Sequence, residues 1–260
     1  MTYRVRLWGG SSPHRLSRSL CHDRIPLVEL RRYTLHPGRR DTLIELFDRE
    51  FVETQEAQGL RVIGQFRDLD DANRFVWLRG FADMARRAQG LAAFYGGPVW
   101  QAHRDAANAT MVDSDDVFLL RPAWPGAGID GEAPRRAKPG TTDTPPGLLD
   151  AAVFPLRAPA GSDLLALCRE VLSPVLRQGG ARRIGWYVTE ASPNNFPRLP
   201  VREGEPVLVG LALFHSPAAF DAFARGGAWA RDAQPTLAPW LAGPTESHRL
   251  TPTARSALHA

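Results

Sequence analysis

The residues best suited to chemistry lie in the first half of the 260-residue chain, beginning with a predicted strand over residues 74–81. Alternation along this strand places four large side chains on one face: Phe75, Trp77, Arg79 and Phe81. We expect the opposite, aliphatic face to meet the helices and the aromatic face to meet the interior. There Arg79 could hold a carboxylate or phosphate in bidentate fashion, or could pair with Glu29 across the sheet.

A predicted helix near residues 98–110 has one face that is more polar than the face with which a helix normally packs on a hydrophobic core. Its members follow helical spacing: Trp100, His103, Arg104, Ala107, Asn108 and Met111. In an enzyme, His103 would transfer the proton, while Arg79 and Arg104 would hold an anion. The competing interpretation makes His103 a hydrogen-bonded residue of the core or of its rim.

A third predicted element, the strand over residues 27–35, places Glu29, Arg31 and Tyr33 on one face by the same alternation. The candidate ligand-binding residues are therefore Tyr33, Trp77, Arg79, Trp100, Arg104 and Asn108. Trp77 and Trp100 would form the walls, unless both are ordinary core residues. At the matched positions of the second half, Gly210 and Ala212 stand where Trp77 and Arg79 stand in the first, which suggests room for a ligand.

Several classes of chemistry are excluded by missing motifs. The sequence has no GxSxG elbow, phosphate-binding GxxxxGK[ST] loop, HExxH motif or GxGxxG that directly joins a strand to a helix. Cys21 and Cys168 lack the spacing of a metal site or a disulfide framework. The acidic run at residues 113–116 is typical of a solvated turn, so we expect neither a metal nor a cofactor.

The elements that position these residues occur twice along the chain. Residues 61–64 (RVIG) are matched by residues 182–185 (RRIG), and the strand 74–81 by 206–214. Both halves have the order strand, helix, strand, strand, helix, strand, with an extra helix before the last strand. This order predicts an α+β fold of two fused ferredoxin-like βαββαβ domains packed sheet to sheet.

The predicted boundaries follow from composition. A leader over residues 1–25 precedes the first domain, residues 26–122, and a Pro- and Gly-rich linker over 123–147 leads to the second, residues 148–252. Residues 253–260 form a tail. Ser216 is expected to cap a helix of the second domain.

Charge and hydropathy argue against several partners. The net charge is +4, and the leader alone supplies that excess through five arginines and one aspartate. A body without excess positive charge is not typical of a nucleic-acid-binding protein. No apolar run is long enough to span a bilayer and no signal peptide is evident, so we expect a cytoplasmic protein.

Residues 28–122 resemble the NIPSNAP family, and the second half looks like a diverged copy. The resemblance is carried by residues 29–38 (ELRRYTLHPG), by Gly64 and Phe66 in the hairpin, and by the closing residues 119–122 (LLRP). It implies a dimeric α/β barrel, formed here by two halves of one chain, with further dimerisation open. Barrels of this kind include oxygenases without cofactors, haem-dependent enzymes and binding proteins, so the resemblance selects no reaction.

The functional hypothesis is a protein that binds a small aromatic or acyl acid in an apolar, arginine-bearing barrel cavity. One alternative is a cofactor-independent monooxygenase or isomerase acting on a phenolic substrate. The other is a non-catalytic interaction protein.

Overall fold

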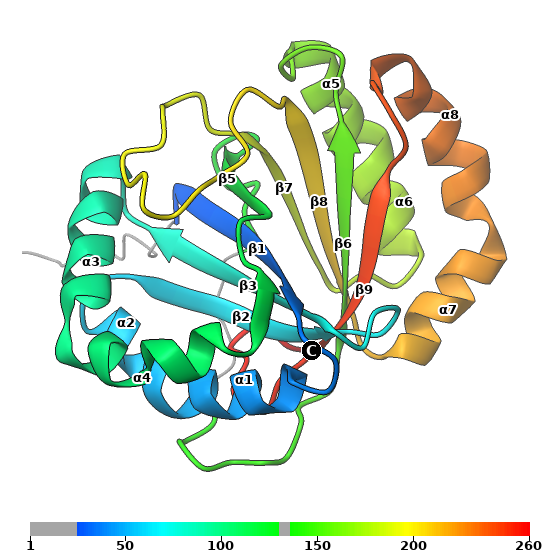
Figure 1. Cartoon of the computed structure of the whole chain (residues 1–260). Coiled ribbons are helices and arrows are strands. Elements are labelled where there is room, and N and C mark those ends of the chain that lie inside the picture. Colours follow the sequence, from blue (N-terminus) through cyan, green and yellow to red (C-terminus); the bar gives the residue numbers. More distant parts are fainter. Residues whose placement is uncertain (1–24, 130–135) are drawn as a thin grey trace, which may run out of the picture.

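The chain folds as an antiparallel β-barrel with helices on its outside (Figure 1). The computed structural model describes residues 25–129 and 136–260. The strands are β1 (Leu27–Leu35), β2 (Arg61–Asp68), β3 (Arg74–Phe81), β4 (Met111–Asp113), β5 (Val117–Pro122), β6 (Leu148–Pro155), β7 (Arg183–Thr189), β8 (Val207–Phe214) and β9 (Glu246–Pro252). The strands of the barrel have the order β3-β2-β9-β6-β8-β7-β5-β1, and pairing of β1 with β3 closes the ring. The short strand β4 pairs with the end of β1. The predicted α+β class is confirmed.

Each half contributes four neighbouring strands to the barrel. The first half has the order β5-β1-β3-β2 and the second the order β9-β6-β8-β7. The halves meet through antiparallel pairing of β2 with β9 and of β5 with β7. Their contact is thus continuous backbone hydrogen bonding as well as side-chain packing.

The helices lie on two sides of the barrel (Figure 1). The first half supplies α1 (Arg40–Leu46), α2 (Val52–Glu56), α3 (Met84–Gly96) and α4 (Pro98–Asn108). The second half supplies α5 (Ser162–Leu167), α6 (Ser173–Gln178), α7 (Pro217–Gly226) and α8 (Gln234–Leu237). π-Helical turns link α1 to α2 at Phe47–Phe51, link α5 to α6 at Cys168–Leu172, and precede α8 at Trp229–Ala233.

The helix that precedes the last barrel strand, β5 in the first half and β9 in the second, differs between the halves. A 3-10 turn, Ala238–Trp240, follows α8, whereas α4 is continuous. The helices after β3 and β8 begin alike, because the side chains of Asp83 and Ser216 each accept a hydrogen bond from a backbone N–H three residues later. The expected cap at Ser216 is therefore confirmed.

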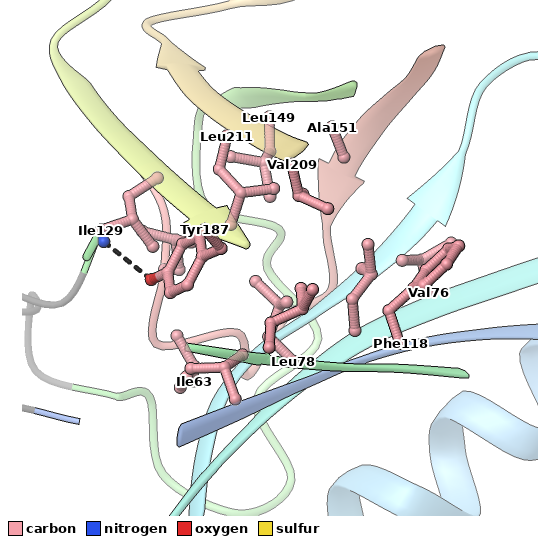
Figure 2. Packing of buried hydrophobic residues seen from close by; sticks show 14 of the residues in the cluster. Ile63, Val76, Leu78, Phe118, Ile129, Leu149, Ala151, Tyr187, Val209 and Leu211 are labelled. Carbon is pink, nitrogen blue, oxygen red and sulfur yellow. Dashed lines mark hydrogen bonds between the residues drawn. The ribbon is translucent and has the colours of Figure 1, made fainter. Parts of the chain in front are cut away.

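The barrel interior is a packed, mainly aliphatic core shared by both halves, which also contains the rings of Phe66, Phe118 and Tyr187. Figure 2 shows Val76 and Leu78 of β3 pointing toward Val209 and Leu211 of β8. Trp77 and Phe75, by contrast, pack beneath the helices of the first half. The prediction that the aromatic and arginine face would point inward, and the aliphatic face toward the helices, is wrong.

The physical reason is the difference in width between the barrel interior and the space between the sheet and its helices. An eight-stranded barrel has an interior just wide enough for side chains to fill, and branched aliphatic residues fill it without gaps. The large rings of β3 lie instead between the sheet and its helices, where Trp77 meets Phe47 at a ring-centroid distance of 4.8 Å. An arginine-bearing cavity in the barrel interior is excluded among the described residues, because that space is occupied.

The connection between the halves and the C-terminal segment both pack onto the barrel where the structure describes them. The backbone N–H of Ile129 donates to the Tyr187 hydroxyl over 2.8 Å (Figure 2). Arg136 donates to the carbonyl oxygen of Arg255 over 2.6 Å, and Leu258 is buried in the barrel core. The predicted leader falls almost entirely on residues 1–24, which lie outside the described residues.

Across residues 25–129 and 136–260, no helix is both long and apolar enough to cross a lipid bilayer. In the same part of the chain, no three His, Cys, Asp or Glu side chains come together as metal ligands would.

Candidate functional site

Each half has a cavity between the outer face of its strands and its helices. The first cavity, of about 340 Å³, has aromatic walls formed by Tyr33, Tyr95, Trp100 and Phe196. Its cationic side chains are Arg31, Arg104 and Arg198. The second cavity, of about 270 Å³, is lined mainly by apolar and aromatic residues and contains the carboxyl group of Asp150.

A buried charge cluster lies beside the first cavity and is centred on Glu29. Nη2 of Arg79 donates to Oε2 of this carboxylate over 2.6 Å, Nη1 of Arg31 donates to the same oxygen over 2.9 Å, and Nε of Arg87 donates to Oε1 over 2.8 Å. All four side chains are at most 1 % exposed. β1 supplies Glu29 and Arg31, β3 supplies Arg79, and α3 supplies Arg87.

The cluster holds more positive than negative charge. Burial opposes ionisation of Glu29, but the charges of Arg79, Arg31 and Arg87 outweigh it and hold the pKa of this carboxyl well below its ordinary value. Three arginines and one carboxylate leave a net charge of +2. The cluster's other hydrogen-bond partners are neutral: Tyr33, Tyr95, Gln55, Asn194, Asn195 and the carbonyl of Ser114.

Arg31 connects this cluster to the first cavity. Its Nε donates to the Tyr33 hydroxyl over 2.9 Å. Burial raises the pKa of the Tyr33 phenol, which therefore stays neutral at pH 7 and adds no negative charge. With the bonds to Glu29 and to the Ser114 carbonyl, Arg31 uses three of its five N–H donors within the described residues.

The first cavity brings together four of the predicted ligand-binding residues: Tyr33, Trp100, Arg104 and Asn108. Trp77 and Arg79 lie beneath it and do not line it. Arg79 is fully buried and bonded to Glu29, Gln55 and Tyr95, which is the structural pairing weighed against the anion-clamp role.

His103 also lies outside the cavity lining. Its Nε2 is 3.6 Å from Oε2 of Glu50, and its side chain is 32 % exposed. This is the rim position weighed against the catalytic role, because α4 turns His103 toward the π-helical turn at Phe47–Phe51.

One wall of the first cavity comes from the second half of the chain and was missed in the sequence. The segment 190–206, between β7 and β8, reaches across to α3 (Figure 1) and contributes Phe196 and Arg198. It is fastened by Asn194 and Asn195, whose side-chain oxygens accept hydrogen bonds from Arg87. The segment is long and rich in Pro and Asn, which indicates a loop. This composition does not indicate which part of the molecule the loop contacts.

The second cavity lies where small residues were matched to Trp77 and Arg79. A Cβ at Gly210 would come within 2.8 Å of the Trp186 ring, so that ring occupies the room opened at this position. The remaining space lies beside Ala212 and Ala152, next to Asp150. The small residues Gly210 and Ala212 indicate this space in the sequence, whereas no local pattern marks Asp150 as part of its lining.

Asp150 is only partly buried by surface area because its carboxyl faces the cavity, yet protein surrounds it closely. Burial raises the pKa of Asp150 to about 6, while a hydrogen bond from Ser247 and the nearby His248 act in the opposite direction. Oγ of Ser247 donates to Oδ1 over 2.8 Å. No ion pair of Asp150 occurs among the described residues.

Comparison with known proteins gives a family match within the first half and a shared fold over most of the chain. Residues 28–124 match the NIPSNAP family, so the resemblance seen in the sequence is confirmed. None of the curated proteins matches the sequence.

Three solved structures share the fold over most of their length. A candidate monooxygenase of Fusobacterium nucleatum has 7% identity and a TM-score of 0.55, over 88% of this chain and 93% of that one. A candidate monooxygenase of Lactobacillus acidophilus has 10% identity and a TM-score of 0.50, over 88% and 94%. An anthrone oxidase-like protein has 16% identity and a TM-score of 0.50, over 92% and 97%. Identities this low establish a common fold only.

Proposed function

We propose that the first cavity binds a small molecule with an anionic head and an aromatic or acyl body. The observation that carries this proposal is the net charge of +2 in the buried cluster of Glu29, Arg31, Arg79 and Arg87. Buried charge is unfavourable unless it is paired, so a ligand carboxylate would offset part of the excess.

Arg31 would make the closest contact with the anion. It lines the cavity and keeps donors that the described residues do not use. Arg104 and Arg198 are exposed at the mouth and would attract the anion from solution. Asp115 is the carboxylate on the lining and is exposed to solvent, which screens its repulsion.

The walls suit a flat or extended apolar body. Tyr95 and Trp100 meet edge to face at 4.8 Å between ring centroids, and Tyr95 stacks on Phe196 at 6.2 Å. A ring or a short acyl chain would replace water along these faces.

The test is calorimetric titration of the full-length protein with phenylacetate and with decanoate, beside the uncharged phenylacetamide. We expect the acids to bind and the amide to bind at least tenfold more weakly. Arg104→Gln and Arg198→Gln should each weaken acid binding by roughly threefold to tenfold, because each removes one attractive charge at the mouth. Arg86→Gln, which changes an exposed arginine of α3 away from the lining, is the control. Equal binding of acid and amide would overturn the proposal.

A second function, oxygenation of a phenolic substrate without a cofactor, is favoured by the fold shared with an anthrone oxidase-like protein. The same positive charge would stabilise a phenolate bound in the first cavity. The measurement that separates catalysis from binding is oxygen consumption with anthrone as the probe, compared between wild type and Arg104→Gln.

We also propose that the two halves are copies of one ferredoxin-like unit. The support is that the four strands of each half have the same order, and that the two middle strands of each half pair in the same register. Leu27 lies opposite Phe81 in the first half, as Leu148 lies opposite Phe214 in the second. Further association into a homodimer is part of the same proposal, and native mass spectrometry tests it.

A further inference from the structure

The carboxylates of Glu29 and Asp150 occupy corresponding places in the two halves. Glu29 lies opposite Arg79 in the pairing of β1 with β3. Asp150, likewise two residues beyond the Leu–Phe pair that begins the ladder, lies opposite Ala212 in the pairing of β6 with β8. An acidic side chain is therefore present in both halves, while the arginine that faces it is present only in the first.

The other two arginine partners of the first carboxylate are also replaced. Arg31, two residues after Glu29, corresponds to Ala152. Arg87, four residues after the helix cap Asp83, corresponds to Phe220, four residues after the cap Ser216. Ala152, Ala212 and Phe220 all line the second cavity. The cavity thus occupies the space where three guanidinium groups surround Glu29 in the first half.

The cations near Asp150 are engaged elsewhere. Arg249 lies opposite Asp150 in the pairing of β6 with β9, but its guanidinium bonds to Asp70, with Nε 3.0 Å from Oδ2, and contacts Asp221. The adjacent His248 is bonded to Asp68, with Nδ1 2.8 Å from Oδ2. Within the described residues, Ser247 is the side chain that donates a hydrogen bond to the Asp150 carboxyl.

The remaining walls suit an organic cation. Trp186, Trp229, Phe154 and Phe223 line the cavity, with Phe154 and Trp229 at 6.3 Å between ring centroids. Aromatic faces attract ammonium groups, and they also bury the apolar body that carries such a group. No arginine, lysine or histidine is among the lining residues.

We propose that the second cavity binds a small aromatic ammonium ion, with its nitrogen on Asp150 and its ring between Trp186, Phe220 and Trp229. The ligand supplies the positive charge that Arg31, Arg79 and Arg87 supply to Glu29. This site is independent of the anion site proposed for the first cavity and selects the opposite charge. The volume of about 270 Å³ suits a single ring with a short side chain.

The test is titration of the full-length protein with 2-phenylethylamine at pH 7.5, followed by calorimetry and by tryptophan fluorescence, since two tryptophans line the cavity. The neutral 2-phenylethanol and the anionic 3-phenylpropionate are the matched probes. We expect the amine to bind and to alter fluorescence. The alcohol should bind about tenfold more weakly, and the acid should not compete with the amine.

Two variants locate the binding. Asp150→Asn keeps the size of the side chain and removes its charge, so amine affinity should fall by at least about tenfold. Ala212→Arg places a guanidinium opposite Asp150, as Arg79 stands opposite Glu29, and should abolish amine binding while circular dichroism shows an intact fold. Asp163→Asn, at an exposed carboxylate of α5, is the control and should bind as wild type does.

The proposal is overturned if the wild-type protein does not bind the amine, or if Asp150→Asn and Ala212→Arg, both folded, bind it as tightly as wild type. A failure of Asp150→Asn to fold leaves Ala212→Arg to decide. Loss of acid binding in the first cavity would not affect either result.

Discussion

At the scale of single residues, Glu29 and Asp150, which lie at corresponding positions of β1 and β6, have opposite electrostatic surroundings. Glu29 is held ionised by three arginines, whereas Asp150 has none within bonding distance among the described residues. The same position in the sheet therefore carries a positive cluster in one half and an uncompensated acid in the other. These two environments give opposite expectations for stability.

Glu29→Gln is predicted to destabilise the fold strongly. The substitution leaves Arg31, Arg79 and Arg87 buried without their common counter-charge, and breaking a buried pair in this way costs about 3–5 kcal/mol. Urea unfolding followed by circular dichroism measures the free energy of unfolding. The exposed Glu45→Gln, in α1, is the control and should change it by less than about 0.5 kcal/mol. An equally small effect at Glu29 would show that the cluster contributes little.

Asp150→Asn is predicted to stabilise the free protein at neutral pH and to have no effect in acid. The pKa of Asp150 rises on folding from 3.8 to about 6, so its stabilising contribution is fully present below pH 3.8 and is lost as pH rises through 6. Above pH 7 the variant should therefore be more stable by roughly 2 kcal/mol, allowing for partial exposure of the carboxyl. Thermal melts between pH 4 and pH 8 make the measurement. A gain that is constant across this range would contradict the assigned cause.

At the scale of elements, residues 253–260, which follow β9, pack against both halves of the barrel. Arg255 is 2 % exposed and donates to the carboxylate of Glu53 in α2, and Leu258 enters the barrel core. The backbone N–H of Ala260 bonds to the carbonyl of Pro146, just before β6. The segment thus joins the helices of the first half to the start of the second.

Removal of residues 253–260 is predicted to lower the free energy of unfolding by more than about 3 kcal/mol, because it exposes the apolar core around Leu258 and deletes the Arg255 contacts. Differential scanning calorimetry gives the result. Removal of residues 1–24 is the comparison, and we expect it to leave the melting temperature nearly unchanged, since that segment lacks periodic apolar residues. A larger effect from the N-terminal deletion would reverse this expectation.

At the scale of the whole molecule, closure of the barrel makes each half depend on the other. The interior core draws aliphatic residues from strands of both halves (Figure 2), and the β2–β9 and β5–β7 pairings supply backbone bonds between them. A half alone would leave an apolar sheet face and two strand edges in water.

Cleavage between the halves is therefore predicted to leave them associated. A protease recognition sequence inserted between Thr142 and Asp143, which are both exposed, allows the intact protein to be cut after folding. Size-exclusion chromatography should then show both fragments eluting together at the position of the uncut chain. Separation of the fragments without denaturant would show that barrel closure contributes less than we infer.

The sequence by itself determined the elements and their order. Period-two and period-3.6 patterns placed most strands and helices close to their observed bounds, although the short strand β4 was not predicted. Alternation also put Glu29, Arg31 and Tyr33 on one face, and the structure keeps them together. These features depend on residues that are close together in the sequence, so local sequence patterns are enough to predict them.

Tertiary structure decided which face of each strand points inward and which distant residues share a site. Alternation separates two faces but does not rank them when both are buried, so the face bearing Trp77 and Arg79 was assigned to the wrong side. Arg87 meets Glu29 from 58 residues away, and Asn194 reaches Arg87 from 107 residues away. Such contacts depend on closure of the barrel and on the path of one loop, which no local pattern specifies. The isolation of Asp150 is likewise a property of the positions around it in space, and it appears only once those positions are known.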